Sequence, residues 1–349
     1  MHRKPARAKV WIRDRDKDFD MTLRKVATGL VAFAQMAVAG IAVAQDRPVI
    51  DVGILSYGTA QWEMQVIQDN GLDTDAGIEL VVTDLGSEQA GDLALQAGNV
   101  DVILTDFLWV SAQRNAGNLI TSIPHSRAVG GVMVHPGAGI ESLDQLAGTT
   151  IGIAGGPVDK SWIILQSAWE SLNGDTLAEQ VDARFAAPPL VNELLVSGDL
   201  PVALNFWHYN ARARAAGMTE LVSVTELLAD LGVDGPAPLL VWAFTDETAQ
   251  ARPEAIRGFL DASFAAKRML LEDDAVWESL RAKMRAEEDD RLFTELRDAY
   301  REGIIADLDP GLYDTASRTF DIMAEQGGAD LVGRDAVFAE DTFWTGYGD

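Results

Sequence analysis

The sequence predicts an α/β protein of two lobes, each a mainly parallel β-sheet flanked by helices, with a ligand cleft between the lobes. Two observations support this fold class. Short apolar stretches alternate with stretches of helical periodicity, which is the pattern of β-α units around a parallel sheet. These units fall into two blocks joined by two crossing strands, and no fixed-period repeat of the kind that indicates a solenoid is visible.

The first block begins at the apolar stretch 47–58, which is expected to form a strand that ends at Gly58. A helix is expected from about residue 60 to residue 70, because Gly71 then provides the usual C-cap residue. The same unit recurs, with alternating strands and helices expected at 78–85, 88–98, 100–106 and 107–117.

The second block starts with a glycine-flanked strand at 129–135. Its further strands and helices are expected at 150–155, 160–174, 181–186, 191–198, 201–207, 208–217 and 220–224. The apolar strand 238–245 follows, and after it the periodicity is only helical, with Pro253 at a first-turn position. We therefore expect the first part of lobe 1 at 45–131, lobe 2 at 132–238, and a return to lobe 1 with C-terminal helices at 239–349.

The N-terminal region has the features of an exported protein. Residues 21–44 combine a basic start, an apolar run and a small-residue site at Ala42 to Ala44, as a cleaved secretory signal does. A membrane anchor is the alternative, but the apolar run is short and is interrupted by Gln35. The polar extension 1–20 indicates that Met21 is the natural start, so residues 1–44 are left out of the expected fold.

Charge and cysteine content exclude several classes of function. Removal of residues 1–44, which carry a net charge of +5, takes the formal net charge from −26 to −31. Such a charge opposes binding to nucleic acids and to anionic membranes. The absence of cysteine excludes disulfides, thiolate metal ligands, a cysteine nucleophile and a lipid-modified cysteine. An exported, unanchored protein without cysteine indicates the Gram-negative periplasm.

Candidate ligand contacts are the residues that follow the expected strands, because open parallel sheets bind ligands beyond the carboxyl ends of their strands. In lobe 1 these residues are Tyr57, Thr59, Gln61, Trp62, Thr105, Asp106 and Trp109. In lobe 2 they are Gly155, Gly156, Asp159, Ser161, Trp162, Asn205 and Trp207.

The glycine corner at 155–156 is not a nucleotide-binding loop, because Ala154 and Asp159 stand where a phosphate loop has glycines. Asp159 is expected to cap the next helix, and a capping carboxylate occupies the N–H groups that an anion would need. The strand-end aromatic residues, together with Asp106 and Asp159, suit a neutral or cationic organic solute. Core packing is the alternative role for each tryptophan. Helix capping is the alternative role for Thr59, Thr105 and Ser161.

No pattern of catalytic residues stands out. His125, His135 and His208 lack the spacing of metal ligands, and no serine lies in a nucleophile-elbow sequence. We therefore expect a monomeric binding protein with no catalytic residues, no metal and no cofactor.

Five stretches of the chain resemble the solute-binding components of ABC importers, in the nitrate, sulfonate and taurine group related to thiamine-precursor binding proteins. The resemblance spans about 49–304, and its most specific stretches are 58–73, 101–114, 152–166, 187–200 and 203–213. It implies a type II periplasmic binding protein, with two lobes that close about a double hinge around a small solute. It also implies an ABC permease in the inner membrane as partner, and places the glycine corner 155–156 at the ligand pocket.

The resemblance is incomplete in two respects. Relatives that bind sulfonate or taurine need donors for an anionic head group, whereas this chain has Asp106 and Asp159, so the identity of the solute does not transfer. A pyrimidine-precursor synthase of the same fold uses a cysteine-rich motif that this chain lacks.

A second function remains open from the sequence. Part of the chain resembles a subgroup that accompanies quinoprotein alcohol oxidation, and the aromatic tail FWTGYGD at 343–349 has no evident role. The alternative is therefore a periplasmic partner of a quinoprotein dehydrogenase or its cytochrome.

Overall fold

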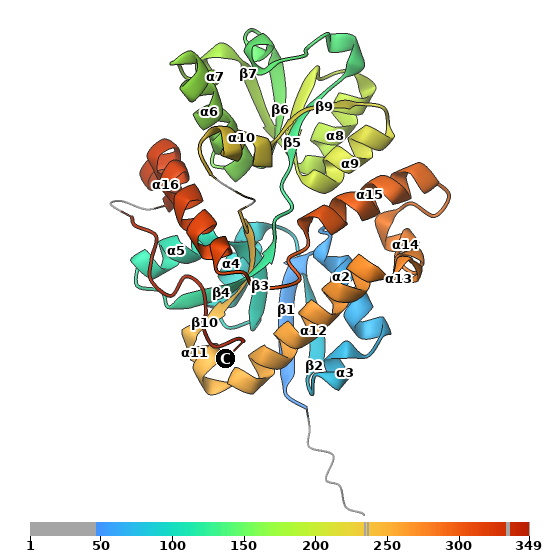
Figure 1. Cartoon of the computed structure of the whole chain (residues 1–349), viewed down its shortest axis with the longest axis vertical. Coiled ribbons are helices and arrows are strands. Elements are labelled where there is room, and N and C mark those ends of the chain that lie inside the picture. The colour runs from blue at the N-terminus through green and yellow to red at the C-terminus, as the bar shows by residue number, and fades with distance from the viewer. Residues whose placement is uncertain (1–46, 234, 236, 333–335, 349) are drawn as a thin grey trace, which may run out of the picture. The chain divides into compact units, whose positions relative to one another are not determined.

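Two five-stranded β-sheets, one in each lobe, organise the part of the chain that the structure describes (Figure 1). The computed structural model describes residues 47–348, except 234, 236 and 333–335. The signal peptide and the upstream extension expected at 1–44 lie outside these residues. The expected two-lobed α/β fold is confirmed.

The lobe 1 sheet has the strand order β2-β1-β3-β10-β4. Strand β1 pairs in parallel with β2 and β3, whereas β10 runs antiparallel to both β3 and β4. The bounds are β1 (Val49–Leu55), β2 (Glu79–Leu85), β3 (Val102–Asp106), β4 (Ile120–Ser126) and β10 (Leu240–Thr245).

The lobe 2 sheet repeats this plan with the order β7-β6-β8-β5-β9. Strand β6 pairs in parallel with β7 and β8, and β5 is the reversed strand. The bounds are β5 (Gly131–Val134), β6 (Thr150–Ala154), β7 (Asp182–Ala186), β8 (Val202–Asn205) and β9 (Thr219–Ser223). In both sheets, the loops after the parallel strands therefore leave from one edge, and these two edges carry the candidate ligand contacts.

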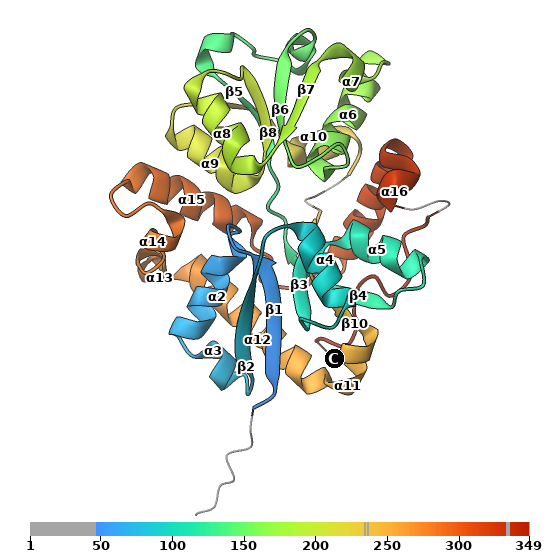
Figure 2. The same cartoon turned by 180° about the vertical axis from the view of Figure 1, so that it is seen from behind.

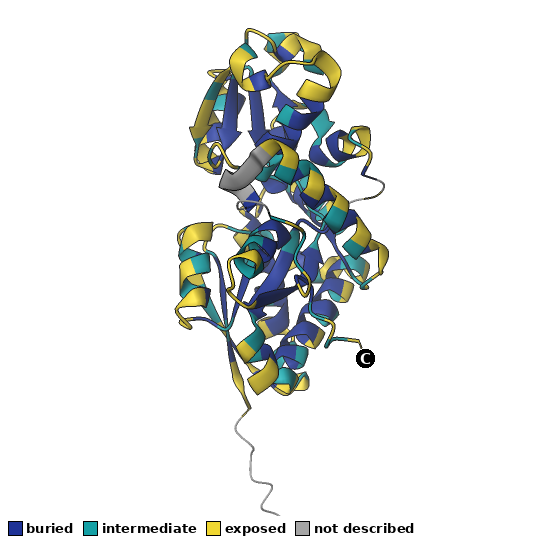
Figure 3. Cartoon of the chain, turned by 90° about the vertical axis from the view of Figure 1, so that its left-hand side faces the viewer, coloured by how far each residue is buried: buried dark blue, intermediate teal, exposed yellow. Residues whose placement is uncertain are grey.

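Helices flank both sheets, and Figure 3 shows the strands buried between them. The helices between strands of lobe 1 are α2 (Ala60–Asp69), α3 (Leu72–Asp75), α4 (Glu88–Gln96) and α5 (Phe107–Asn115). Those of lobe 2 are α6 (Lys160–Asn173), α7 (Leu177–Gln180), α8 (Pro188–Ser197), α9 (Trp207–Ala215) and α10 (Val224–Asp230), with single 3₁₀ turns at Pro136–Ala138 and Leu143–Leu146. None of the helices in the described part of the chain combines the length and the apolar composition needed to span a bilayer.

The C-terminal helices contact both lobes. They are α11 (Asp246–Ala251), α12 (Pro253–Glu272), α13 (Asp274–Glu278), α14 (Arg281–Met284), α15 (Asp290–Gly303) and α16 (Gly311–Val332). Helix α12 packs on β1 and α2, while α15 packs on α9 of lobe 2. Helix α16 lies against both α5 and α6, as Figure 2 shows.

The sequence prediction lacks strand β4, helix α16 and several short helices, among them α3, α7 and α10. Strand β4 has the sequence ITSIPHS, in which Pro124 and the polar residues break the apolar alternation that indicates a strand. Proline is tolerated in an edge strand, and β4 lies at the edge of its sheet. Helix α16 was not recognised because its apolar residues are interrupted by alanines and glycines.

The aromatic tail packs on lobe 1. Trp344 contacts Phe244 edge to face, with ring centroids 5.3 Å apart, and Tyr347 stacks on Phe264 at 5.4 Å. The Tyr347 hydroxyl donates a hydrogen bond of 2.8 Å to Asp261. These contacts give the tail a structural role in covering the lobe.

One of the two crossings between the lobes is tightly packed at Gly130. A Cβ atom at this position would lie 1.6 Å from the carbonyl oxygen of Asn205, at the end of β8. The carbonyl oxygen of Gly130 accepts a 3.0 Å hydrogen bond from the N–H of Val224. The crossing can approach β8 this closely only because residue 130 has no side chain.

Substitution Gly130→Ala is expected to destabilise the protein by about 3 kcal/mol, because the clash is with backbone rather than with a flexible side chain. Urea unfolding followed by circular dichroism measures this loss. Gly86→Ala is the control, since a Cβ there has no neighbour within 4 Å. Equal unfolding free energies for the two variants would contradict the close approach at Gly130.

Candidate functional site

A cleft runs between the strand-end edges of the two sheets and consists of three connected cavities. The first, of about 480 Å³, is called the acidic end and is lined by Glu88, Asp92, Asp106, Asp159 and Lys160, among others. The middle, of about 130 Å³, shares Asp106 and Lys160 with it. The third, of about 540 Å³, is called the basic end. It shares His208 with the middle and is also lined by Arg212, Lys283 and Arg285.

Twelve of the fourteen sequence-predicted contact residues line this cleft. From lobe 1 they are Tyr57, Thr59, Gln61, Trp62, Thr105, Asp106 and Trp109. From lobe 2 they are Gly155, Gly156, Asp159, Ser161 and Trp207. The strand-end argument therefore collects residues from four separate segments at one place, although contact with a ligand stays a prediction.

Trp162 and Asn205 do not line the cleft. The Trp162 side chain is 2% exposed and packs edge-on against Phe185 in the lobe 2 core. Asn205 is hydrogen-bonded on both sides of its amide, because its Nδ2 donates to the Pro188 carbonyl at 3.0 Å and its Oδ1 accepts from the Phe206 N–H. Asn205 thus fixes the starts of two helices, α8 and α9.

Trp62 and Trp207 contact each other across the lobe boundary. Their ring centroids are 6.0 Å apart at an interplanar angle of 89°, and Tyr300 of α15 packs against both rings. Trp62 is 3% exposed and Trp207 is 9% exposed. The two tryptophans expected to face a ligand from opposite walls are therefore mainly packed against one another, at the floor of the cleft.

Two carboxylates cap helices at the acidic end. Asp106 accepts a 2.8 Å hydrogen bond from the Trp109 N–H at the start of α5. Asp159 accepts bonds of 3.0 and 3.2 Å from the N–H groups of Ser161 and Trp162, at the start of α6. The expected capping role of Asp159 is confirmed. Thr59 occupies the N-cap position of α2 but makes no capping bond with its side chain.

Lys160 joins the two lobes at the acidic end. Its Nζ lies 2.7 Å from Asp106 Oδ2 and 3.3 Å from Glu88 Oε2, both in lobe 1, whereas Lys160 belongs to lobe 2. Burial alone would lower the pKa of Lys160, but Asp106 and Glu88 raise it well above the ordinary value. The residue is therefore an ammonium ion held between carboxylates of the opposite lobe.

The acidic end has more negative than positive charge. Burial, and then the charge of Asp106, raise the pKa of Asp92 to about 7, and burial raises the pKa of Asp159 to about 6. The sequence analysis did not select Glu88 and Asp92, because they lie in α4 rather than at a strand end. Their spacing of four residues, which places them on one helix face, was the available indication.

The basic end was also missed. Arg212 lies in the last turn of α9, while Lys283 and Arg285 lie in or just after the short helix α14. Nothing in the local sequence relates these two segments, which are about 70 residues apart in the chain. Only the packing of the C-terminal helices on lobe 2 brings them to one cavity.

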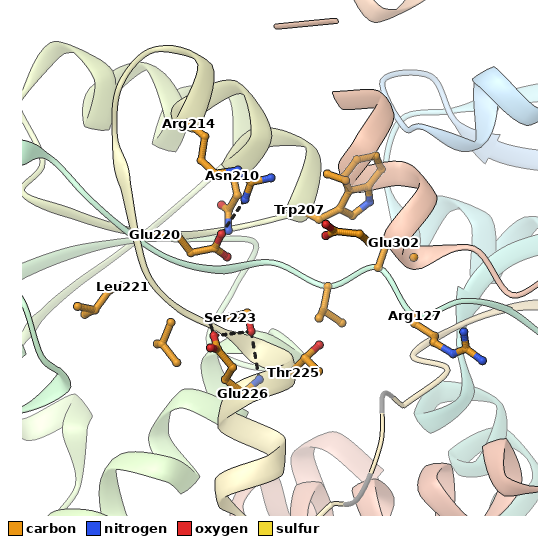
Figure 4. A pocket seen from close by; sticks show the side chains of 15 residues that line it. Arg127, Trp207, Asn210, Arg214, Glu220, Leu221, Ser223, Thr225, Glu226 and Glu302 are labelled. Carbon is orange, nitrogen blue, oxygen red and sulfur yellow. Dashed lines mark hydrogen bonds and ion pairs between the residues drawn. The ribbon is translucent and has the colours of Figure 1, made fainter. Parts of the chain in front are cut away.

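A fourth cavity, of about 600 Å³, lies beside the crossing segments and is shown in Figure 4. Among its charged side chains, Arg214 lies 2.7 Å from Glu220 and 3.0 Å from Glu295, and Arg127 donates to the Ile304 carbonyl oxygen at 3.4 Å. Ser223 and Glu226 form a capping box at the start of α10. Of the sequence-predicted residues, only Trp207 reaches this cavity, so the interlobe cleft is the better candidate site.

Among the described residues, no group of three or more His, Asp or Glu side chains is arranged to hold a metal ion. The cleft thus offers carboxylates, an ammonium group, guanidinium groups and aromatic rings. These groups suit non-covalent capture of an organic solute.

Comparison with known structures finds the same fold in ABC-importer binding proteins. The periplasmic aliphatic sulphonate-binding protein SsuA of Escherichia coli is 14% identical, with a TM-score of 0.65 over 85% of this chain and 92% of that one. The alkanesulfonate-binding protein SsuA of Xanthomonas axonopodis pv. citri, bound to MOPS, is 12% identical with a TM-score of 0.65 over 86% and 99%. The ligand-binding component of an ABC-type import system from Staphylococcus aureus, with zinc bound, is 14% identical with a TM-score of 0.62 over 85% and 96%.

At these identities the structural likeness shows the fold alone. A search of curated proteins finds no sequence match. The family model described as NMT1/THI5 like matches residues 64–274, which include most of both lobes. The chain therefore belongs to the NMT1/THI5-like family.

Proposed function

We propose that this protein is the periplasmic solute receptor of an ABC importer, which captures a small organic solute in the interlobe cleft and delivers it to a membrane permease. Family membership supports the proposal, as do structural neighbours described as periplasmic binding proteins. The expected signal sequence at 21–44 supports a periplasmic location.

The single observation that carries the proposal is the position of Lys160. Its ammonium group contacts Asp106 and Glu88 of the other lobe while three connected cavities remain open beside it. An ion pair of this kind forms only when the two strand-end edges are close together. The cleft therefore combines a closed arrangement of the lobes with space for a small molecule, as a receptor that closes on its solute requires.

The role as partner of a quinoprotein dehydrogenase is not proposed. The aromatic tail that motivated it packs on lobe 1, with Phe343 buried and Trp344 against Phe244.

Closure can be measured directly because the chain contains no cysteine. Cysteines introduced at the exposed positions Glu141 (lobe 2) and Glu247 (lobe 1) accept a donor and an acceptor dye. A bound solute is expected to narrow the distribution of energy transfer toward the closed value and to raise the melting temperature. At a concentration of 100 times Kd it adds about 2.7 kcal/mol of stability.

The probes are a panel of sulfonates, amines, amino acids and pyrimidines. The receptor proposal fails if no member of the panel changes either the energy transfer or the melting temperature.

Substitution Lys160→Met is expected to shift the unliganded protein toward lower energy transfer, because Asp106 and Glu88 would then face Asp159 without a counter-ion. Arg184→Met is the matched control, since Arg184 pairs with Asp182 on the lobe 2 surface. Identical distributions for Lys160→Met and the unmodified protein would show that Lys160 does not hold the lobes together.

The pH dependence of stability tests the excess of negative charge at the acidic end of the cleft in the protein without solute. The pKa of Asp92 is raised in the folded protein, so its contribution to stability is full below about pH 4 and is lost as the pH rises through about 7. Substitution Asp92→Asn removes this loss. The melting temperature of the variant, relative to the unmodified protein, is expected to rise between pH 4 and 8.

Asp144→Asn, at an exposed position of lobe 2, is the control and is expected to show no such trend. Calorimetric scans across this pH range measure both differences. If the difference in melting temperature between Asp92→Asn and the unmodified protein does not change with pH, Asp92 is ionised normally in the folded state.

A further inference from the structure

The two ends of the cleft carry opposite charges. The acidic end is formed by α4, by the start of α5 and by the start of α6, whereas the basic end is formed by α9 and α14. Figures 1 and 2 place these two groups of helices on opposite sides of the line that joins the lobes. The middle cavity shares lining residues with both ends, and apart from Glu88, Asp106, Asp159 and Lys160 its lining is mostly apolar, with Leu55, Val129 and Leu240. The cleft is therefore electrically dipolar along its length.

The cations of the basic end have no acidic partner. Within the described part of the chain, no carboxylate lies within 4.0 Å of the charged groups of Arg212, Lys283 or Arg285. Arg212 donates only to the backbone carbonyl of Met284, at 2.8 Å. Asp84, the one acid that lines this end, accepts a hydrogen bond from Gln61. Three cations without a carboxylate partner among the described residues therefore line one cavity of a chain whose formal net charge is −26.

His208 supplies an independent indication of a ligand. It is 7% exposed and lines both the middle and the basic end, yet neither ring nitrogen has a hydrogen-bond partner among the described residues. Burial, and then the charge of Arg212, lower the pKa of His208 to about 3, so the ring is neutral at pH 7. A buried polar group without a partner is costly. Both ring nitrogens are buried in this arrangement, so a ligand supplies the missing partner once the ring turns toward the cleft.

The acidic end lacks positive charge. Lys160 is the one cation there, and its ammonium group is shared between Asp106 and Glu88. The Oδ1 atom of Asp92 is buried without a hydrogen-bond partner. The Asp159 carboxylate accepts hydrogen bonds from the first N–H groups of α6. Among the described residues, no cation lies within ion-pair distance of it. A second ammonium group at this end would therefore face two carboxylates, Asp92 and Asp159, that have no cation within ion-pair distance among the described residues.

We propose, building on the receptor function above, that the solute is a zwitterion with separated charges, whose ammonium group lies at the acidic end and whose anionic group lies at the basic end. A simple anion would leave Asp92 and Asp159 unpaired, and a simple cation would leave Arg212, Lys283 and Arg285 unpaired. A solute with both charges on neighbouring carbons could contact one end only. The apolar middle suits an alkyl or aromatic segment between the two charged groups.

A matched set of probes tests the charge requirement. The set comprises ω-amino carboxylates of increasing chain length, the carboxylates without the amine, the alkylamines without the carboxylate, and the corresponding α,ω-diamines. Binding is measured by isothermal titration calorimetry on the mature chain. One zwitterion is expected to bind at least about tenfold more tightly than the anion and the amine of the same length, since each charge-assisted hydrogen bond adds more than 1.4 kcal/mol.

Variants at each end assign the two charges. Asp92→Asn is expected to weaken binding of the zwitterion about tenfold and to leave binding of the anion unchanged. The double variant Lys283→Gln with Arg285→Gln is expected to weaken binding of the zwitterion and to leave binding of the amine unchanged. The side chains of Lys283 and Arg285 are both exposed, so this double variant does not disturb the apolar core. Asp144→Asn and Arg184→Gln, outside the cleft, are the controls and are expected to leave all affinities unchanged.

The outcomes separate this inference from the receptor function. If a simple anion, amine or diamine binds as tightly as the best zwitterion, the inference is overturned while the receptor function stands. The inference is also overturned if the two variants weaken all probes equally, because charge position would then not matter. If no probe of any class binds and the panel used for the receptor proposal also gives no closure, both proposals fail.

Discussion

The contact between Lys160 and Asp106 is the interaction on which the geometry of the cleft depends. It joins the first residue of α6 in lobe 2 to the capping residue of α5 in lobe 1, at 2.7 Å. An exposed ion pair contributes little to stability. Here Asp106 is buried, and removal of Lys160 would leave the Asp106 carboxylate without a counter-ion between the lobes. The same ammonium group reduces the repulsion among the other carboxylates of the acidic end, so the closed arrangement and the charge pattern of the site have one origin.

Much of the fold could be predicted from the sequence because its indications are local. Glycines end the helices, apolar runs form the strands, and Asp159 caps α6 as its position before a helical run suggested. Strand β4 was missed for an equally local reason, since Pro124 and His125 interrupt its pattern at a sheet edge. The strand-end argument selected twelve residues that line the cleft, and their contact with a ligand stays a prediction. It also selected Trp162, which is buried in the core because a first-turn helical residue can point back onto its own sheet as readily as into the cleft.

The rest of the site could not be predicted because it depends on packing between distant segments. Arg212 becomes part of a cavity with Lys283 and Arg285 only because α14 and α15 fold back against α9. The tryptophans follow the same logic. Trp62 and Trp207 were both expected to stack on a solute, yet their rings pack against each other. Trp277 also packs against Trp62, and Tyr300 packs against both tryptophans. Aromatic residues at strand ends therefore identified the region of the site but not the groups that would contact a ligand.

The last long helix, α16, packs into an apolar cluster that contains residues of both lobes. Buried residues Ala316, Phe320 and Met323 of α16 belong to one apolar cluster that also contains Ile103 from lobe 1 and Ile151 from lobe 2. A boundary crossed by a continuous hydrophobic core does not separate independently folding domains. We therefore expect the two lobes to unfold together in one cooperative transition, although each has its own sheet. An isolated lobe expressed alone would expose the apolar surface that α16 covers.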